Sequence, residues 1–183
     1  MVGFLIPEVN QEGKPVKTVR TNTTYEEIIF ERLEPLIPAL EKHYEFQYKG
    51  TEQPFSFEWF TQDSVGEPTC DNSSYLRKKW LRTKARDFTG ILFLCDYQET
   101  TPFEKDFEVY GGKLEFPQWG FGFNPQRGTL IVYPSEPHFI NMTARINAGD
   151  LYQVRFHMAA TSPYIYKPEM FPGDLNSWFA NVK

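Results

Sequence analysis

The side chain that we expect to do chemistry in this sequence is His138, one of three histidines in the chain. An imidazole titrates near neutral pH and binds metal ions, so it can serve in acid–base chemistry or in metal coordination. His138 stands within residues 111–155, where a Gly pair precedes an alternating segment, followed by a Pro-Gln-Arg-Gly turn, an apolar strand and a polar loop. This order of elements predicts part of a compact β-barrel in which a loop presents His138.

The composition indicates that strands position this histidine. The chain has 183 residues, of which 40% are hydrophobic and 17% aromatic, with 17 phenylalanines. Aromatic residues favour strands, and a chain of this length is long enough to bury one sizeable core. We therefore expect a single domain over residues 1–183, with helical and edge support at 1–62, a barrel core at about 63–160 and a C-terminal segment at 161–183 that wraps the outside.

Charge and cysteine content argue against several classes of protein. The formal net charge is −5, which argues against a nucleic-acid-binding protein, because such proteins need a basic face. No apolar run reaches the roughly 18 residues that span a bilayer, so we expect a soluble, cytoplasmic protein without a membrane segment. Cys70 and Cys95 are too few for a secreted disulfide scaffold, and their apolar surroundings predict buried, reduced thiols.

One helix is predicted on the N-terminal side of the strands. Thr24 followed three residues later by Glu27 forms a capping box, and apolar residues then recur at helical spacing. Pro35 and Pro38 each remove an amide donor, so the helix should kink or restart near Glu34. The apolar side of this helix needs a sheet to cover.

The rest of the chain reads as short strands. Residues 44–48 and 55–60 alternate with period two around a turn and predict an antiparallel pair. Residues 87–97 form a nearly continuous apolar run, as expected of a central strand covered on both faces. Further strands are predicted at 113–116, 129–133, 139–146 and 151–158. Such a run of strands after one helix predicts a sandwich or barrel with the helix packed outside.

The connecting segments are harder to interpret. Residues 1–22 suggest a short hairpin or edge segment. Residues 73–86 form the one basic interval, centred on Trp80, which we interpret as a solvated loop or short helix. The polar stretch 98–110 is long enough to be a rim or lid.

Taken in order, these segments resemble the iron(II)- and 2-oxoglutarate-dependent oxygenases, and most closely their prolyl-hydroxylase-like branch. The resemblance rests on RDFTGILFLCDY, GGKLEF and NPQRGTLIVYPS, followed by a histidine, a Gly-containing turn and a strand with an arginine. The GG-x-L-x-F and P-x-x-G-x-L elements match at Gly111–Phe116 and Pro125–Ser135. The likeness covers roughly residues 66–158, half of the chain, and is specific only as an ordered set.

The resemblance implies a mainly β fold with an outer helix, namely a double-stranded β-helix of the jelly-roll, cupin-like type. The family holds iron at the mouth of this barrel with a His-x-Asp pair and a distal histidine, which together occupy one face of the ion. Ligands at i and i+2 point to the same side of a strand. By this likeness His138 takes the distal position and Asp71 the carboxylate position, while Thr69 stands where the proximal histidine belongs.

The same resemblance implies a binding site for 2-oxoglutarate. Arg155 is the candidate for its distal carboxylate, because a guanidinium makes a bidentate, charge-assisted pair with a carboxylate. A second family pattern puts the basic residue two after the turn glycine, but that position is Leu151, which cannot serve. Thr129 and Tyr133 share one strand face, and their hydroxyls are weaker candidates for supporting the same carboxylate.

Thr69 is a serious departure from the family. A neutral hydroxyl is a poor ligand for a divalent ion, so Asp71 and His138 alone should bind iron weakly. Two other histidines could compensate. His43 begins a His-x-acid spacing but lies outside the resembling stretch, whereas His157 shares a strand face with Arg155.

Three interpretations remain open from the sequence. In the first, the chain is an enzyme, an Fe(II)- and 2-oxoglutarate-dependent dioxygenase, with ascorbate as a further cofactor, that hydroxylates a C–H bond of a peptidyl (for instance prolyl) or small-molecule substrate. In the second, it is an oxygenase-fold binding or structural module that lost turnover with the proximal histidine. In the third, Thr69 is a change introduced into an active parent, since the flanking residues keep the pattern.

Overall fold

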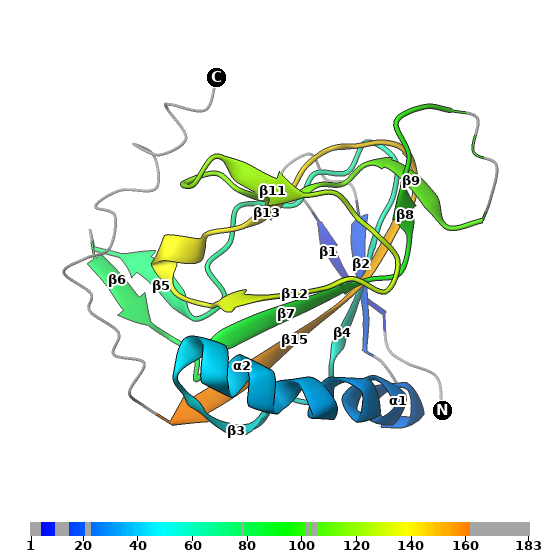
Figure 1. Ribbon diagram of the computed structural model, residues 1–183. Helices are drawn as coiled ribbons and strands as arrows, with labels where there is room; N and C mark the ends of the chain where they lie inside the picture. The colour runs from blue at the N-terminus through cyan, green and yellow to red at the C-terminus, as the bar shows by residue number, and fades with distance from the viewer. Residues whose placement is uncertain are drawn as a thin grey trace.

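The computed structural model describes part of the chain, and Figure 1 shows its arrangement. The described residues are 5–9, 15–20, 23–77, 79–101, 103 and 106–161, with side chains described from Tyr25 onward. Apart from Thr161, the C-terminal wrap expected at 161–183 lies outside these residues. No helix within the described ranges is long and apolar enough to cross a membrane.

The largest element of the fold is a seven-stranded antiparallel sheet. Its strands run in the order β1-β2-β4-β15-β7-β12, and β3 pairs with the end of β15. Their bounds are β1 (Leu5–Val9), β2 (Pro15–Arg20), β3 (Gln47–Thr51), β4 (Ser56–Phe60), β7 (Phe88–Phe93), β12 (Leu130–Pro134) and β15 (Leu151–Thr161). The hairpin or edge segment expected at 1–22 is confirmed as the β1–β2 pair.

Smaller sheets lie over one face of this sheet (Figure 1). The bounds of their strands are β5 (Ser73–Leu76), β6 (Lys79–Arg82), β8 (Asp96–Tyr97), β9 (Glu108–Gly111), β10 (Leu114–Phe116), β11 (Phe121–Phe123), β13 (Met142–Thr143) and β14 (Ile146–Gly149). They pair as β11-β10-β13, β14-β9-β8 and β5-β6. Within the described residues the strands therefore form four separately paired sheets and not one closed ring.

The predicted helix covers the opposite face of the large sheet (Figure 1). It consists of α1 (Thr23–Leu33) and α2 (Ile37–Tyr44), joined by a short 3-10 segment, Glu34–Leu36. The expected break near Glu34 is confirmed, because Pro35 and Pro38 lack the amide hydrogens that an unbroken helix needs. The mainly β fold with an outer helix is thus confirmed.

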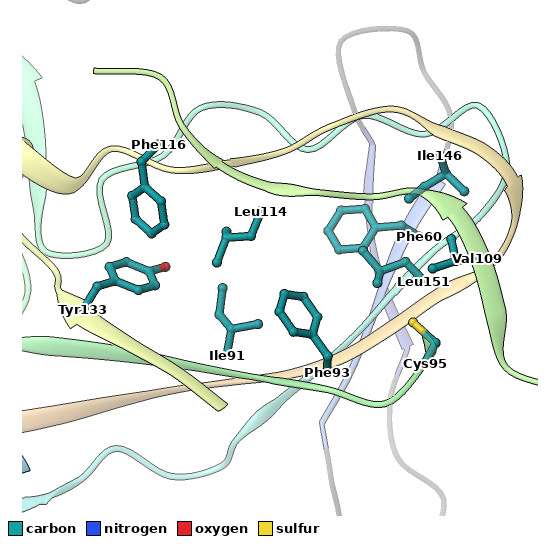
Figure 2. Close-up of a cluster of buried hydrophobic side chains, with 10 residues drawn as sticks. All are labelled: Phe60, Ile91, Phe93, Cys95, Val109, Leu114, Phe116, Tyr133, Ile146 and Leu151. Carbon is teal, nitrogen blue, oxygen red and sulfur yellow. The ribbon is translucent and has the colours of Figure 1, made fainter. Parts of the chain in front are cut away.

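Each face of the large sheet has its own core. On the helix side the buried residues are Leu33, Phe46, Phe55, Phe88, Val154, Phe156 and Met158. On the other side they are Phe60, Ile91, Phe93, Cys95, Val109, Leu114, Phe116, Tyr133, Ile146 and Leu151. Figure 2 shows this second cluster, which fills the space between the large sheet and the smaller ones. We call that space the barrel interior.

Strand alternation explains which side chains reach the barrel interior. Along β15, Val154, Phe156 and Met158 belong to the helix-side core, while Leu151 belongs to the barrel interior. Successive side chains of a strand point to opposite faces. The positions 153, 155 and 157 therefore face the same way as Leu151, and all three are polar.

Three sequence predictions of local structure are wrong. Residues 44–48 and 55–60 do not pair with each other, because the long strand β15 accepts β4 along its first half and β3 along its second. The strand expected at 139–146 is broken into a 3-10 turn, Pro137–Phe139, and parts of β13 and β14. The basic interval 73–86 holds the β5–β6 hairpin, which buries Trp80 to 7% exposure.

Candidate functional site

A cavity of about 450 Å³ opens at the polar end of the barrel interior. We call it the Asp71 pocket. Its walls come from β4, β15, the segments 65–71 and 84–86, and the chain around β13. Three acidic and three basic side chains line it: Glu58, Glu67, Asp71, Lys84, Arg86 and Arg155.

Two backbone segments that are distant in sequence form one wall of this pocket. Thr69 and Asn141 make an isolated antiparallel bridge, in which each backbone amide donates to the carbonyl oxygen of the other, at 2.8 and 3.0 Å. Thr69 is exposed, whereas Asn141 is buried. The bridge brings the Asn141 side chain beside Asp71, two residues after Thr69.

Asp71 accepts hydrogen bonds from three neighbouring side chains. Its Oδ1 accepts from Arg155 Nη1 at 3.3 Å, and its Oδ2 accepts from Asn141 Nδ2 at 3.1 Å and from the Tyr133 hydroxyl at 3.3 Å. Burial alone would raise the pKa of Asp71, but Arg155, together with weaker contributions that include the Asn141 hydrogen bond, holds the pKa below its usual value. Asp71 is therefore a carboxylate at neutral pH.

Arg155 is the centre of the site. Besides Asp71, its Nε donates to Glu58 Oε1 at 2.8 Å, and its Nη1 donates to the Tyr133 hydroxyl at 3.2 Å and to Asn141 Oδ1 at 3.4 Å. Burial by itself would lower the pKa of the guanidinium, but the charge of Glu58 above all raises it well above its usual value. A single arginine thus joins the carboxylate of Glu58, in β4, to that of Asp71, in the segment before β5.

Glu58 is held by a second donor from the same strand face. Gln153 Nε2 donates to Glu58 Oε2 at 2.5 Å, and the Gln153 side chain is only 1% exposed. β4 and β15 pair with Gln153 opposite Glu58 and Arg155 opposite Ser56, so the alternation of both strands turns these side chains into the barrel interior.

A chain of hydroxyl groups supports the next side chain of β15. His157 Nδ1 lies 3.2 Å from Thr89 Oγ1, which lies 2.8 Å from Ser135 Oγ. All three residues are buried. Burial lowers the pKa of His157 from its ordinary value of 6.5 to about 4, and the charges of Arg86 and Arg155 act in the same direction. His157 is therefore a neutral imidazole at pH 7.

The rim of the pocket carries two further cations. Arg86 is held by Glu52 through its Nε and, at 2.8 Å, through its Nη2. Lys84 is exposed, and its ammonium group makes no hydrogen bond or ion pair with the described residues. Both residues also line a neighbouring cavity of about 450 Å³ that shares His157.

Five of the residues singled out from the sequence meet in this site. Asp71, Thr69, Arg155 and His157 line the pocket, and the Tyr133 hydroxyl bridges Asp71 and Arg155 from behind. Burial raises the pKa of Tyr133 well above its usual value, so its hydroxyl keeps the proton that it donates.

Other predicted site residues lie elsewhere. His138 is in the 3-10 turn after β12, with Nδ1 3.1 Å from Glu136 Oε1, and it does not line the pocket. Thr129 immediately precedes β12 and lies four residues before Tyr133. Its backbone carbonyl oxygen accepts a hydrogen bond from the Phe93 amide. His43 is on α2, with its ring against Tyr44.

Cys70 also lines the pocket but is not a nucleophile. Its Sγ points to the Ser135 carbonyl oxygen at 3.4 Å, and burial raises the pKa of its thiol to about 12. Burial likewise raises the pKa of Cys95 to about 11. Both cysteines are free, and Cys95 is buried as predicted, whereas Cys70 is only half-buried.

Sequence reasoning did not assign Glu58, Gln153 or Asn141 to the site, and one signal could have found two of them. Gln153 shares a strand face with Arg155 and His157, and polar residues at every second position of an otherwise apolar strand are typical of a polar site inside a barrel. Glu58 follows the same rule in β4. Asn141 carried no comparable signal, because it sits in an irregular segment between two short elements.

The residues present do not fit the iron that the fold family implies. Within the described part of the chain, no three His, Cys, Asp or Glu side chains are grouped as a metal site requires. Asp71 points both oxygens at protein donors, and one of these donors is a guanidinium cation. Asn141 presents its amide nitrogen to Asp71, and Thr69 supplies only a hydroxyl.

Comparison with known proteins gives structural matches alone. No protein-family model matches the sequence, and neither does any curated protein. Matches to solved structures are numerous.

Three of these structures are two prolyl hydroxylases and a 2OG-Fe(II) oxygenase family protein. A viral collagen prolyl hydroxylase from Paramecium Bursaria Chlorella virus-1 superposes with a TM-score of 0.58 at 11% identity, over 80% of each chain. A Pseudomonas putida prolyl-4-hydroxylase gives 0.59 at 13%, over 86% of this chain and 77% of the other. A 2OG-Fe(II) oxygenase family protein from Burkholderia pseudomallei gives 0.62 at 12%, over 87% and 73%. This chain therefore has the double-stranded β-helix fold of the 2-oxoglutarate oxygenases.

Proposed function

We propose that this chain is an oxygenase-fold binding protein that takes up a small polar ligand in the Asp71 pocket without catalytic iron. One observation carries the proposal. The carboxylate that would anchor a metal is bonded to Arg155, Asn141 and Tyr133. Its two oxygens thus already accept three hydrogen bonds from the protein, one of them from a guanidinium cation.

The electrostatics of Arg155 support this proposal. Two unit charges 4 Å apart interact by about 4 kcal/mol at the effective dielectric constant near a protein surface. A divalent ion on Asp71 would approach the guanidinium at such a distance and would be repelled by about twice that amount. Binding the ion would require Arg155 to leave both Asp71 and Glu58, which would then lose their donor.

The size and lining of the pocket support a binding role. Its volume of about 450 Å³ lies within the range of small-ligand sites. Charged groups and hydroxyls line it, and hydrogen bonds between β4 and β15 fix Glu58 and Arg155. Such preorganised polar groups reduce the entropy that is lost when a ligand binds.

A second candidate function is favoured by the structural neighbours, which include two prolyl hydroxylases and a 2OG-Fe(II) oxygenase. In this alternative, the chain is an Fe(II)- and 2-oxoglutarate-dependent hydroxylase of a peptidyl or small-molecule substrate, with ascorbate as a helper. Asp71 and His138 would then be metal ligands, and Arg155, Thr129 and Tyr133 would hold 2-oxoglutarate. His138 would have to move into the pocket, and Arg155 would have to release Asp71.

Metal binding and turnover separate the two candidates. For the natural chain we expect no Mn(II) binding by electron paramagnetic resonance at millimolar metal, and no succinate from Fe(II), 2-oxoglutarate and oxygen. Succinate formation at catalytic turnover by the natural chain would overturn the proposal. Thr69→His alone should stay inactive, because Arg155 still occupies Asp71.

A redesigned variant provides the matched positive control. Thr69 and Asn141 face each other across the backbone bridge beside Asp71, so histidines at both positions would flank its carboxylate. The variant Thr69→His, Asn141→His, Arg155→Met should therefore bind Mn(II). Mn(II) bound by this variant and not by the natural chain would assign the loss of the metal to these three positions.

A further inference from the structure

The buried end of the Asp71 pocket carries more negative than positive charge. Glu58 and Asp71 both contact the guanidinium of Arg155, at 2.8 and 3.3 Å, so two carboxylates face one cation and leave a net charge of −1. The three side chains are 14%, 8% and 13% exposed, respectively, so solvent screens this charge only in part.

The other groups around this cluster do not supply the missing positive charge. Gln153, Asn141 and Tyr133 are neutral hydrogen-bond partners. His157 is a neutral imidazole at pH 7, because burial lowers its pKa to about 4. Arg86 is already neutralised by Glu52 on the rim.

The same cluster has unused capacity to accept hydrogen bonds. Among the described residues, each Glu58 oxygen accepts one hydrogen bond, from Arg155 or from Gln153. A carboxylate offers about four lone-pair sites, so about two remain on Glu58. The Ser56 side chain lines the pocket next to Glu58 on the same strand face.

We infer that the buried end of the Asp71 pocket binds the protonated amino group of a small ligand, between Glu58 and Asp71. A primary ammonium brings one positive charge and three donors and accepts nothing, which complements both the net charge and the free acceptors. This inference rests on the proposed function, because a metal ion at Asp71 would take the same charge. Because the net charge at the buried end is −1, a dianion such as 2-oxoglutarate is repelled there.

Lys84 is the remaining cation that lines the pocket. Its ammonium group is exposed and has no bonded partner in the described part of the chain. It lies close enough to Glu52 to lower the pKa of that carboxyl, but Arg86 is the larger cause. Lys84 is therefore placed on the rim and does not occupy the buried end.

The test is a nuclear magnetic resonance titration of the full chain with small probes. n-Butylammonium should bind with a Kd on the order of 1 mM, a reasonable affinity for a fragment with one charged anchor. Butyrate should bind at least about tenfold more weakly, because it meets the same carboxylates. Tetramethylammonium, which has the charge but no donor, should also bind at least about tenfold more weakly.

Two glutamates of the same pocket give a matched pair of variants. Glu58→Gln removes the buried charge and should weaken n-butylammonium at least about tenfold, whereas Glu67→Gln changes an exposed residue and should alter Kd less than about threefold. If Glu58→Gln does not fold, Ser56→Asp adds a carboxylate at the same place and should strengthen binding by about tenfold.

The outcomes separate this inference from the proposed function. Equal affinity for butyrate and n-butylammonium, or equal loss in the two glutamine variants, would overturn the inference alone. Catalytic succinate formation by the natural chain would overturn the proposed function and the inference together. Selective n-butylammonium binding that Glu58→Gln abolishes would support the inference.

Discussion

The two ends of the barrel interior are built from the same strands but by different physical means. At one end, Ile91, Phe93 and Leu151 are completely buried and pack against other apolar side chains (Figure 2). At the other end, two to four residues along the same strands, Thr89 and Arg155 face the same interior. We call these the apolar end and the polar end.

The difference separates what holds the fold from what determines its chemistry. Apolar packing depends on volume and area and accepts many sequences of suitable size. A buried polar network tolerates only partners that satisfy each donor and acceptor, because a buried group without a partner is costly. In this chain apolar packing at one end holds the double-stranded β-helix together, while at the polar end Arg155 joins the carboxylates of Glu58 and Asp71.

The largest effect should come from the apolar end. Phe93→Ala would remove a fully buried ring and should lower the free energy of unfolding by about 4 kcal/mol, as large-to-small core substitutions do. Urea denaturation measures this change. Phe123, which is 40% exposed, is the matched control, and its alanine variant should lose less than about 1 kcal/mol. Equal losses would mean that the cluster in Figure 2 is not the core.

The next largest effect should come from the centre of the polar end. Arg155→Met would leave the two carboxylates that it joins without their cation, which should cost about 3 kcal/mol, because breaking a buried ion pair leaves an uncompensated charge. Urea denaturation at pH 7 measures the loss.

Two control variants make the Arg155 prediction specific. Arg127→Met removes a surface arginine that is 46% exposed and should cost less than about 1 kcal/mol. Adding Asp71→Asn and Glu58→Gln to Arg155→Met should restore part of the loss, because it removes the unpaired charges. A triple variant less stable than Arg155→Met would contradict the charge argument.

The fold could be predicted from the sequence where local pattern and long-range packing agree. The broken helix follows from Pro35 and Pro38, and β15 follows from strict alternation over residues 151–158. The true partner of residues 44–48 and 55–60 could not be predicted, because the partners of a strand depend on the whole sheet. Here the 11-residue length of β15 offers room for both β3 and β4.

The site could be predicted only in part, for a similar reason. The ordered motifs identify Asp71 and Arg155 as site residues. In the structure, Arg155 Nη1 lies 3.3 Å from Asp71 Oδ1. The sequence cannot show that they bind each other, since 84 residues separate them. His138 was chosen as the histidine nearest the expected position, but the residue that faces Thr69 across the backbone bridge is Asn141.

The smallest of these effects distinguishes the polar end by its response to pH. The pKa of His157 is about 4 in the folded chain, against an ordinary value of 6.5. Between these two pH values the imidazole is mostly protonated in the unfolded chain and mostly neutral in the folded chain. Its contribution to stability is therefore complete above pH 6.5 and is lost as the pH falls toward 4. Between pH 7 and pH 5 the loss should be about 2 kcal/mol.

A histidine variant tests this pH dependence. His157→Gln cannot take up the proton, so its unfolding free energy should change less between pH 7 and pH 5 than that of the natural chain. His43→Gln, on the exposed side of α2, should keep the full dependence. Protonation of Asp71 does not contribute to the change between pH 7 and pH 5. Its pKa is lowered in the folded chain, so the stability that its carboxylate provides is lost only below about pH 4. Identical pH profiles for the natural chain and His157→Gln would show that protonation of this imidazole does not set the acid sensitivity of the polar end.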